Sequence, residues 1–472
     1  MATDNTHFGA AAIDRMLKKA KHVFFIGIGG INMSSLAHIT HRRGYEVSGS
    51  DRSPTVLTES LAARGIRVCY GHDAAHVANA DAVVYTVAIS PDNPEYLAAK
   101  ERGIPCISRA DYLGYLMTGY GARVGIAGMH GKSSCTSRCA QTLLRANAAP
   151  TVLSGAALST MGGAYHVGGE DYFVFEACEY MDSFLDFSPT VAVILNVEMD
   201  HVDYFHSMEQ IRASFGRYAA LTGKAGSCIY NADDIETLTS LKAYEGKRIT
   251  FGIDSAEATY RAVNLTEMRG CYAFDVLREG EFFAHISLGV TGRYQVYNAL
   301  ATTAVCDGCG LSPSEITEGL ATFPGARRRM EWKGRLNGAP VYDDYGHHPT
   351  EILATLAGAR GLTEKGGRLF CVYQPHTYSR TKALFDQFAE ALKTADRVIL
   401  TDVYAARETD TLGVSSALLA DAVGAGATAC DSMEQAATLL RQEVRPTDAV
   451  VIMGAGDIDR IFEELQKTLT ER

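Results

Sequence analysis

A glycine-rich loop between a short strand and a helix constrains the fold of this chain more than any other feature. Residues 124–127 form a strand-like run, residues 128–134 read Gly-Met-His-Gly-Lys-Ser-Ser, and a helix pattern rich in small residues follows. In such a loop the backbone N–H groups turn inward around phosphate oxygens, a lysine neutralises their charge and a hydroxyl can reach Mg²⁺. The strict phosphate-loop pattern requires glycine where Ile126 stands, so an ordinary strand-to-helix turn is the alternative. The loop predicts an α/β sheet with a phosphate site at one strand end.

Three successive rhythms of strand-like and helix-like segments predict an α/β protein of three domains. The 472 residues also correspond to about three domains of ordinary size. We expect boundaries near Gly121 and at the Phe-Pro-Gly hinge of 323–325, which gives domains at 1–120, 121–323 and 324–472. Short β-branched or aromatic runs predict strands at 23–28, 45–48, 82–89, 105–108, 124–127, 172–176, 191–196, 369–373, 397–402 and 449–453.

Composition excludes several classes of protein. Hydrophobic residues make up 47% of the chain and charged residues 21%, which excludes a disordered scaffold. The net charge is −11 and no basic stripe is visible, so we expect no nucleic-acid partner. The apolar runs are strand-sized, far below the roughly 18 residues of a membrane span, so we expect no membrane insertion. Eleven scattered cysteines and an opening without a secretory leader pattern indicate a cytoplasmic protein with reduced thiols.

A second glycine turn follows the first expected strand. It contains Gly27, Gly29 and Gly30, and Asp51 ends the next strand roughly 20 residues on, the usual offset of a dinucleotide-binding acid. Asn32 replaces the third glycine of that fingerprint, so a tight structural turn is the alternative to a nucleotide contact. Asp51 would bind a ribose or base, or only cap the strand end.

Titratable side chains follow two strands of the central segment. Glu176 ends one expected strand, and Asp200 and His201 follow the next strand that can be recognised. Parallel sheets bind ligands at the carboxyl ends of their strands, and one carboxylate, the Ser133 hydroxyl and phosphate oxygens suffice for Mg²⁺. An imidazole ligand leaves Mn²⁺ as the alternative. We expect the neighbouring acids to be solvated loop carboxylates: Glu179, Asp182 and Glu198.

The last third of the chain contains a dense group of titratable residues. Residues 343–351 read Asp-Asp-Tyr-Gly-His-His-Pro-Thr-Glu between a strand-like pair and a helix, which favours a site over a plain turn. Arg380, after the next strand, is a candidate partner for a carboxylate or phosphate. Arg329 lies in a basic run at the domain junction. We expect it either to bind a phosphate group or to be an ordinary solvated side chain. Asn298 lies in a long Ala-rich helix. We expect its side chain either to form hydrogen bonds to an adenine base or to be a buried amide.

Together these segments resemble the Mur ligase family, over essentially the whole chain. The resemblance rests on segments 27–30, 48–51, 88–95, 128–134, 343–351, 374–380 and 403–406, on Glu176 with Asp200 and His201, and on Arg293 with Asn298. The string at 343–351 is the most specific of these. The resemblance implies a Rossmann-like N-terminal domain, a central P-loop ATPase-like domain with a parallel or mixed sheet, and a Rossmann-like C-terminal domain.

The resemblance also implies the chemistry. ATP-dependent ligation would join L-alanine to the lactyl carboxylate of UDP-N-acetylmuramate through an acyl phosphate, with Mg²⁺ or Mn²⁺ as the metal. The N-terminal domain would hold the UDP, the central domain the ATP and the C-terminal domain the amino acid. The sequence leaves the oligomeric state open.

The resemblance assigns site residues by type of contact. The implied catalytic residues are Lys132, Glu176, His201 and His347, and the implied metal ligands are Ser133, Glu176 and His201. The implied ATP contacts are Gly128, Met129, His130, Gly131, Lys132, Ser133, Ser134, Asn298, Arg329 and Asp344. The implied contacts to the other substrates are Gly29, Gly30, Ser50, Asp51, His72, His348, His376 and Arg380.

Some positions depart from the family pattern. Cys178 replaces the commoner aspartate, Tyr294 stands where a histidine often flanks the adenine, and Thr377 stands where an arginine is usual. Alternative functions are a ligase that adds another amino acid or a recycled peptide to UDP-N-acetylmuramate, and a sugar-nucleotide sensor without turnover. The intact Lys132 and His201 argue against the sensor.

Overall fold

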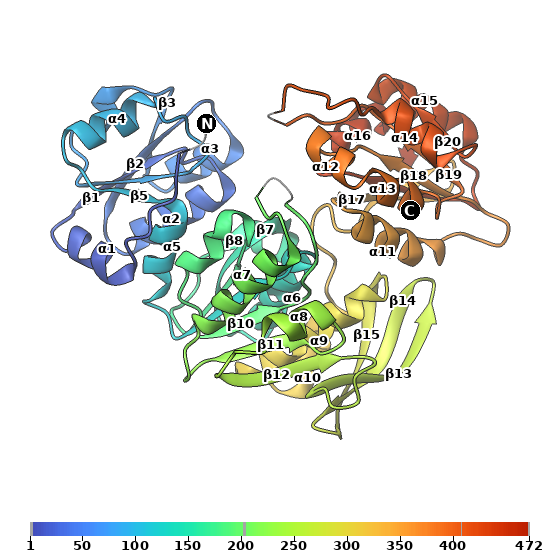
Figure 1. The fold of residues 1–472 in the computed structure, drawn as a ribbon, viewed down its shortest axis with the longest axis horizontal. Coiled ribbons are helices and arrows are strands. Elements are labelled where there is room, and N and C mark those ends of the chain that lie inside the picture. The colour runs from blue at the N-terminus through green and yellow to red at the C-terminus, as the bar shows by residue number, and fades with distance from the viewer. Residues whose placement is uncertain (1–2, 202–203, 407, 471–472) are drawn as a thin grey trace.

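The structure is a computed structural model that describes residues 3–201, 204–406 and 408–470. It contains three sheets flanked by helices, and the chain completes each sheet before it starts the next. In Figure 1 the first lobe is blue, the central lobe green to yellow and the third lobe orange to red, and the central lobe lies between the other two. The three-domain α/β fold expected from the sequence is therefore confirmed.

The first sheet is entirely parallel and has the strand order of a Rossmann fold. Its strands lie in the order β3 (Arg67–Tyr70), β2 (Glu46–Asp51), β1 (His22–Ile26), β4 (Ala82–Tyr85) and β5 (Cys106–Ser108). The helices of this lobe are α1 (Ala10–Leu17), α2 (Ile31–Arg42), α3 (Val56–Ala62), η1 (Ala74–Val77), α4 (Pro94–Glu101) and α5 (Arg109–Met117). The strand order reverses between β1 and β4, which opens a crevice at their carboxyl ends.

The second sheet has ten strands, and β6 lies inside it between two parallel neighbours. Its order is β15 (Glu281–Thr291), β14 (Cys271–Arg278), β13 (Tyr260–Met268), β12 (Lys247–Gly252), β11 (Ser227–Asn231), β10 (Val191–Ile194), β6 (Ala122–Ala127), β9 (Tyr172–Glu176), β7 (Thr151–Leu158) and β8 (Gly163–His166). The β13–β15 strands are antiparallel and were not expected from the sequence. The helices are α6 (Lys132–Arg145), η2 (Ser159–Met161), η3 (Tyr180–Asp186), α7 (Met208–Ala220), α8 (Ile235–Ser240), α9 (Tyr294–Gly308) and α10 (Pro313–Ala321).

The third sheet is mixed, with a parallel centre and antiparallel strands at one edge. Its order is β20 (Ala427–Ala429), β19 (Arg397–Leu400), β18 (Leu369–Tyr373), β21 (Ala449–Met453), β17 (Ala339–Asp344), β16 (Glu331–Leu336) and β22 (Leu469–Thr470). The helices are α11 (Pro349–Arg360), α12 (Tyr378–Ala383), α13 (Phe385–Leu392), α14 (Ser416–Val423), α15 (Met433–Glu443), η4 (Ile458–Arg460) and α16 (Ile461–Leu465).

The apolar cores show how the lobes are joined. One continuous core runs from the first sheet, through Tyr112 and Leu116 of α5, to Phe173 and Phe184 of the central lobe. A second core lies on the other face of the central sheet under α6 and α9, and the third lobe has its own cores. Burial of apolar area therefore anchors the first lobe to the central one, whereas polar contacts are prominent between the central and third lobes.

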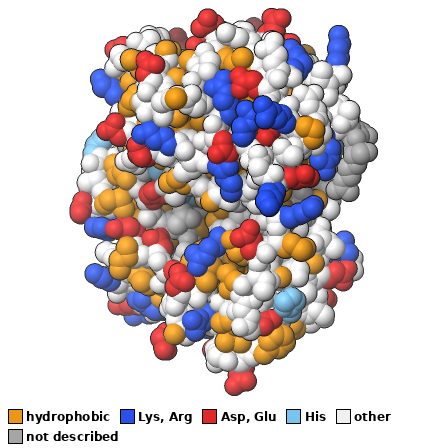
Figure 2. Space-filling view, turned by 90° about the vertical axis from the view of Figure 1, so that its right-hand side faces the viewer, with side chains coloured by type: hydrophobic (Ala, Val, Ile, Leu, Met, Phe, Trp, Pro, Cys, Tyr) orange, Lys and Arg blue, Asp and Glu red, His pale blue; other side chains and the backbone are white. Residues whose placement is uncertain are grey.

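Figure 2 shows acidic and basic side chains interspersed on the face seen from the right of Figure 1, with a small group of basic side chains in its upper half. This face therefore carries no broad field of one sign. Within the described residues, no helix combines the length and the apolar character that crossing a membrane requires. All eleven cysteines lie in described segments and are free thiols.

Candidate active site

The glycine loop joins β6 to α6 and depends on glycine for its shape. Gly128 and Gly131 have φ of +139° and +85°, a region that other residues rarely adopt. A Cβ at Gly131 would lie 2.7 Å from Oδ1 of Asn298, and one at Gly128 would lie 3.0 Å from Cβ of Leu195. The loop thus lies against α9 and the residue that follows β10, and Asn298 lies directly beside it although it is far away in sequence.

Lys132, the first residue of α6, lies in a network of charges. Its Nζ donates to the Gly128 carbonyl at 2.5 Å and to both oxygens of Glu179 at 3.0 Å. Glu179 Oε1 lies 3.1 Å from Nε2 of His201. Burial acts to raise the pKa of Glu179, but the charges of Lys132 and His201 outweigh it and lower that pKa. Glu179 is therefore an ionised, fully buried carboxylate that holds a lysine and a histidine together.

The expectation of solvated carboxylates is wrong for Glu179, which is fully buried. Asp182 is partly buried, and Glu198 keeps 36% of its side chain exposed. Glu179 lies between β9 and η3, and within η3 Met181 and Asp182 take up positive φ. Asp182 pairs with Arg217 at 2.8 Å, and Glu198 Oε1 accepts a hydrogen bond from Thr350 of the third lobe at 2.5 Å.

The expected metal ligands follow three adjacent parallel strands. Ser133 follows β6, Glu176 ends β9 and His201 follows β10. The Glu176 carboxylate accepts hydrogen bonds from Ser154 at 3.2 Å and from the N–H of Gly155, and Ser133 Oγ accepts one from Arg329 at 3.3 Å. A hydroxyl, a carboxylate and an imidazole are all ligand types that a divalent cation accepts, and all three lie at the carboxyl ends of these strands.

The turn at 343–351 enters the site from the third lobe. Both oxygens of Asp344 accept backbone N–H bonds, from Met330 and Gly346, and burial raises the Asp344 pKa to about 6 although Arg329 opposes it. Burial lowers the pKa of His347 to about 4, so this imidazole is neutral at neutral pH.

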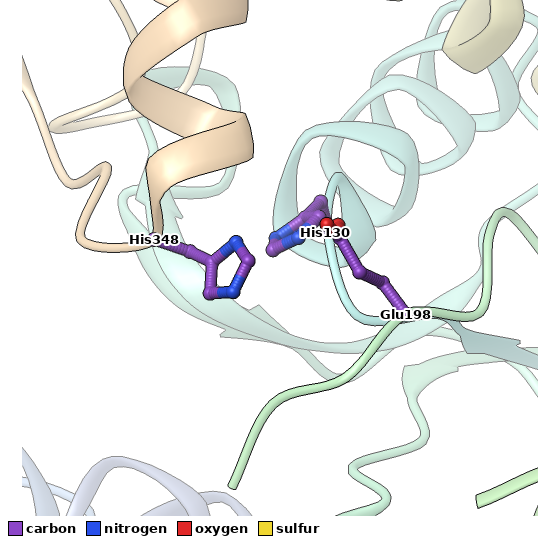
Figure 3. A group of neighbouring side chains, drawn as sticks. All are labelled: His130, Glu198 and His348. Atoms are coloured by element: carbon purple, nitrogen blue, oxygen red, sulfur yellow. Dashed lines mark hydrogen bonds and ion pairs between the residues drawn. The ribbon is translucent and has the colours of Figure 1, made fainter. Parts of the chain in front are cut away.

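A contact between lobes joins the loop to the start of α11. His130 lies 3.0 Å from Glu198 through Nε2 and 3.2 Å from Glu351 through Nδ1. In Figure 3 the rings of His130, from the loop, and His348, from the start of α11, lie opposite each other with Glu198 alongside. One donor atom of each of these three residues lies within 4.8 Å of the others, which could accommodate a cation. Because both nitrogens of His130 already contact carboxylates, we assign the group to contact between the lobes.

Arg380 and Asp200 form a second contact between the central and third lobes. The guanidinium donates to Asp200 Oδ1 through Nε at 3.2 Å and Nη2 at 3.0 Å, and both side chains are nearly buried. Burial acts to raise the pKa of Asp200, but Arg380 outweighs it and holds it far below its ordinary value. His376 lies 3.4 Å from Arg380 and 6.0 Å, between ring centroids, from His347. Thr377, where an arginine is usual, caps α12 instead.

Two cavities each bring together several residues that were expected to contact a nucleotide. One of about 400 Å³ lies between the central and third lobes, and the expected residues that line it are His130, Gly131, Ser134, Asn298, Arg329 and Asp344. Sequence reasoning missed other residues of its wall, among them Asn231, Asp234, Tyr297 and Ala354. The second, of about 1220 Å³, lies at the crevice of the first lobe and is lined by Gly29, Gly30, Asp51 and His72. Ser50 is buried and lies behind this cavity.

Fold, loop and cavities define an ATP-dependent enzyme of the three-lobed ligase type, and the chain belongs to the Mur ligase family. It matches the models "Mur ligase family, catalytic domain" over residues 22–120, "Mur ligase middle domain" over 126–306 and "Mur ligase, glutamate ligase domain" over 328–456.

Particular relatives narrow the comparison. The UDP-N-acetylmuramate--L-alanine ligase of Clostridium novyi is 43% identical over 446 residues, covering 94% of this chain and 96% of the relative. The protein of the same name from Lachnospira eligens is 44% identical over 452 residues, covering 94% and 98%. The crystal structure of UDP-N-acetylmuramate-alanine ligase from Thermotoga maritima superposes with a TM-score of 0.77 at 27% identity, covering 95% and 99%.

Proposed function

We propose that this enzyme joins L-alanine to the lactyl carboxylate of UDP-N-acetylmuramate and converts ATP to ADP and phosphate, a step of peptidoglycan precursor synthesis. The observation that carries this proposal is the Lys132–Glu179–His201 network beside the nucleotide cavity, in a chain about 43% identical to alanine-adding ligases over nearly its whole length. In this proposal the unit 1–120 holds the UDP, 121–323 the ATP and 324–472 the amino acid. We place the reaction in the cytoplasm, where both nucleotides are available.

In the first step the lactyl carboxylate attacks the γ-phosphorus of ATP, and ADP leaves as the acyl phosphate forms. The residues required are those that neutralise the charge spread over the phosphoryl oxygens. Lys132 is positioned for this by Glu179, and Arg329 extends from the third lobe to the Ser133 hydroxyl. Contact between lobes would thus complete the site and exclude water from the acyl phosphate.

In the second step the amine of alanine attacks the carbonyl carbon, a tetrahedral intermediate forms, and phosphate leaves. The amine must lose a proton, and the His347 imidazole is the candidate acceptor near the Arg380 guanidinium: it is unprotonated at neutral pH, although its lowered pKa makes it a weak base. Arg380 would bind the alanine carboxylate in place of part of its contact with Asp200, and His348 and His376 would shape the same pocket.

Mur ligases are ATP-dependent, and a divalent metal accompanies ATP. We propose Mg²⁺, with Mn²⁺ as the alternative, held by Ser133, Glu176 and His201. When bound, the metal would neutralise phosphate oxygens. Hard oxygen donors favour Mg²⁺, whereas the imidazole is the reason for keeping Mn²⁺ open.

Phosphate release from ATP tests the proposal. The assay contains UDP-N-acetylmuramate and L-alanine, with each component omitted in turn, and compares the wild type with Lys132→Ala. Dependence on all three substrates and an inactive variant are expected. Release that does not respond to alanine but responds to glycine, serine or a peptide would replace the proposed amino acid. No turnover with any of these would favour the sugar-nucleotide sensor.

A further inference from the structure

A fully buried carboxylate, Glu95, lies behind the cavity of the first lobe. Asn93 caps α4 and Pro94 starts it, so Glu95 is held in the first helical turn, where the helix dipole favours a negative charge. Its Oε2 accepts a hydrogen bond from Ser50 at 2.6 Å and lies 2.7 Å from Nδ1 of His72. Its Oε1 lies 2.7 Å from Nδ1 of His76. Three polar side chains thus converge on one carboxylate.

Only one of the two histidines lines the sugar-nucleotide cavity. His72 contributes to the same wall as Gly29, Gly30 and Asp51. His76 lines a different cavity of about 570 Å³. Glu95 lines neither of them, and His72 is its one hydrogen-bond partner among the side chains that line the first-lobe cavity.

The contact determines which nitrogen of His72 is available. A carboxylate accepts hydrogen bonds only, so the His72 Nδ1 must carry a proton and donate it to Glu95. The ring then leaves Nε2 for a ligand in the cavity, in a fixed orientation. A carboxylate behind a ligand-binding histidine sets its tautomer and its rotation in the same way in metal sites.

We propose that Glu95 is a positioning residue for UDP-sugar binding, which fixes the ring orientation and Nδ1-protonated form of His72 in the cavity wall. This inference rests on the proposed function, because it takes the first-lobe cavity to be the UDP-sugar site. In this proposal Glu95 contributes to binding of the sugar nucleotide, and it takes no part in ATP binding, alanine binding or the chemical steps.

Glu95→Gln is the test, since it keeps the side-chain shape and removes the charge. The KM for UDP-N-acetylmuramate should rise about tenfold, as expected for loss of a hydrogen bond to a charged group. The kcat and the KM for ATP should stay within about twofold. Asp111→Asn is the matched control: this buried carboxylate of the same lobe binds the N–H groups of Phe8 and Gly9 and lines no cavity described above. It should leave the KM for the sugar nucleotide within about twofold.

A double-mutant cycle distinguishes action through His72 from general weakening of the lobe. In a His72→Ala background, Glu95→Gln should raise the KM by less than about twofold. An equal rise in both backgrounds, or no rise in the single variant, would overturn the inference. If instead the wild type does not bind UDP-N-acetylmuramate in calorimetry, the proposed function fails before Glu95 is tested.

Nitrogen-15 NMR of the histidine rings tests the same contact in the wild type, even if a variant does not fold. The resonance of His72, assigned by its loss in His72→Gln or by sequential assignment, should show a protonated Nδ1. A His72 Nδ1 without a proton would overturn the inference.

Discussion

Protonation of His130 should stabilise the contact between the central and third lobes. Burial acts to lower its pKa, but the charges of Glu351 and Glu198 outweigh it and raise the pKa from the ordinary 6.5 to about 9. That rise corresponds to a free energy on the order of 3 kcal/mol. Only 15% of the His130 side chain is exposed, so solvent screening reduces this little.

The sign of the pH dependence follows from linkage. A group with a raised pKa in the folded state contributes its full stabilisation below its unfolded pKa, here 6.5, and loses it as the pH rises through about 9. The wild type should therefore lose on the order of 3 kcal/mol of unfolding free energy from this group between pH 6 and 10. His130→Gln lacks the titrating imidazole and should not show this loss.

Denaturant unfolding of the ligand-free enzyme, across that pH range, measures the effect as the difference between wild type and variant. Other groups that titrate cancel in this difference. His285→Gln is the control, because His285 pairs with Asp275 at 2.7 Å on the surface, with 60% of its side chain exposed, and such pairs contribute little. If the wild type and His130→Gln differ by the same amount at pH 6 and pH 10, the reasoning is refuted.

Three further substitutions test the site. Gly131→Ala should raise the KM for ATP roughly tenfold, because φ is +85° at this position and the new Cβ would lie 2.7 Å from Oδ1 of Asn298. Steady-state kinetics measures this KM, and an unchanged value would contradict the loop geometry. Glu179→Gln should lower kcat about 100-fold, since Lys132 loses the charge that positions it. Phosphate release measures this kcat, and turnover at the wild-type rate would show that Glu179 does not position Lys132 for catalysis. Arg380→Met should raise the KM for alanine but not the KM for ATP, and equal effects on both would argue against alanine binding at Arg380. The same change should lower the free energy of unfolding by about 3 kcal/mol in denaturant titrations, because it leaves the buried carboxylate of Asp200 unpaired.

Much of the fold could be predicted from the sequence. The expected strands 172–176, 369–373 and 449–453 coincide with β9, β18 and β21. Such strands are buried on both faces, so each appears as a continuous apolar run that needs no partner to be recognised. The expected strand at 82–89 is too long, because residues after Tyr85 turn away at the edge of the crevice.

The β13–β15 strands were missed for the opposite physical reason. Along β15, exposed and buried residues largely alternate, because one face of this antiparallel sheet meets solvent. Alternation of this kind breaks the apolar run into single residues. The alternation at 284–290 is itself a strand signal, so at least β15 was recognisable from the sequence and was overlooked.

The sequence by itself determined the glycine loop, its lysine and the buried parallel strands, because these depend on backbone conformation and on apolar runs within short segments. Only the tertiary structure decided which charges meet. Glu179 became a buried partner of Lys132, and Glu95 a partner of His72, through contacts between segments that are separate in the chain. The sequence around a loop carboxylate does not show whether its side chain is solvated or buried. Only the packing of the surrounding elements determines which group it contacts.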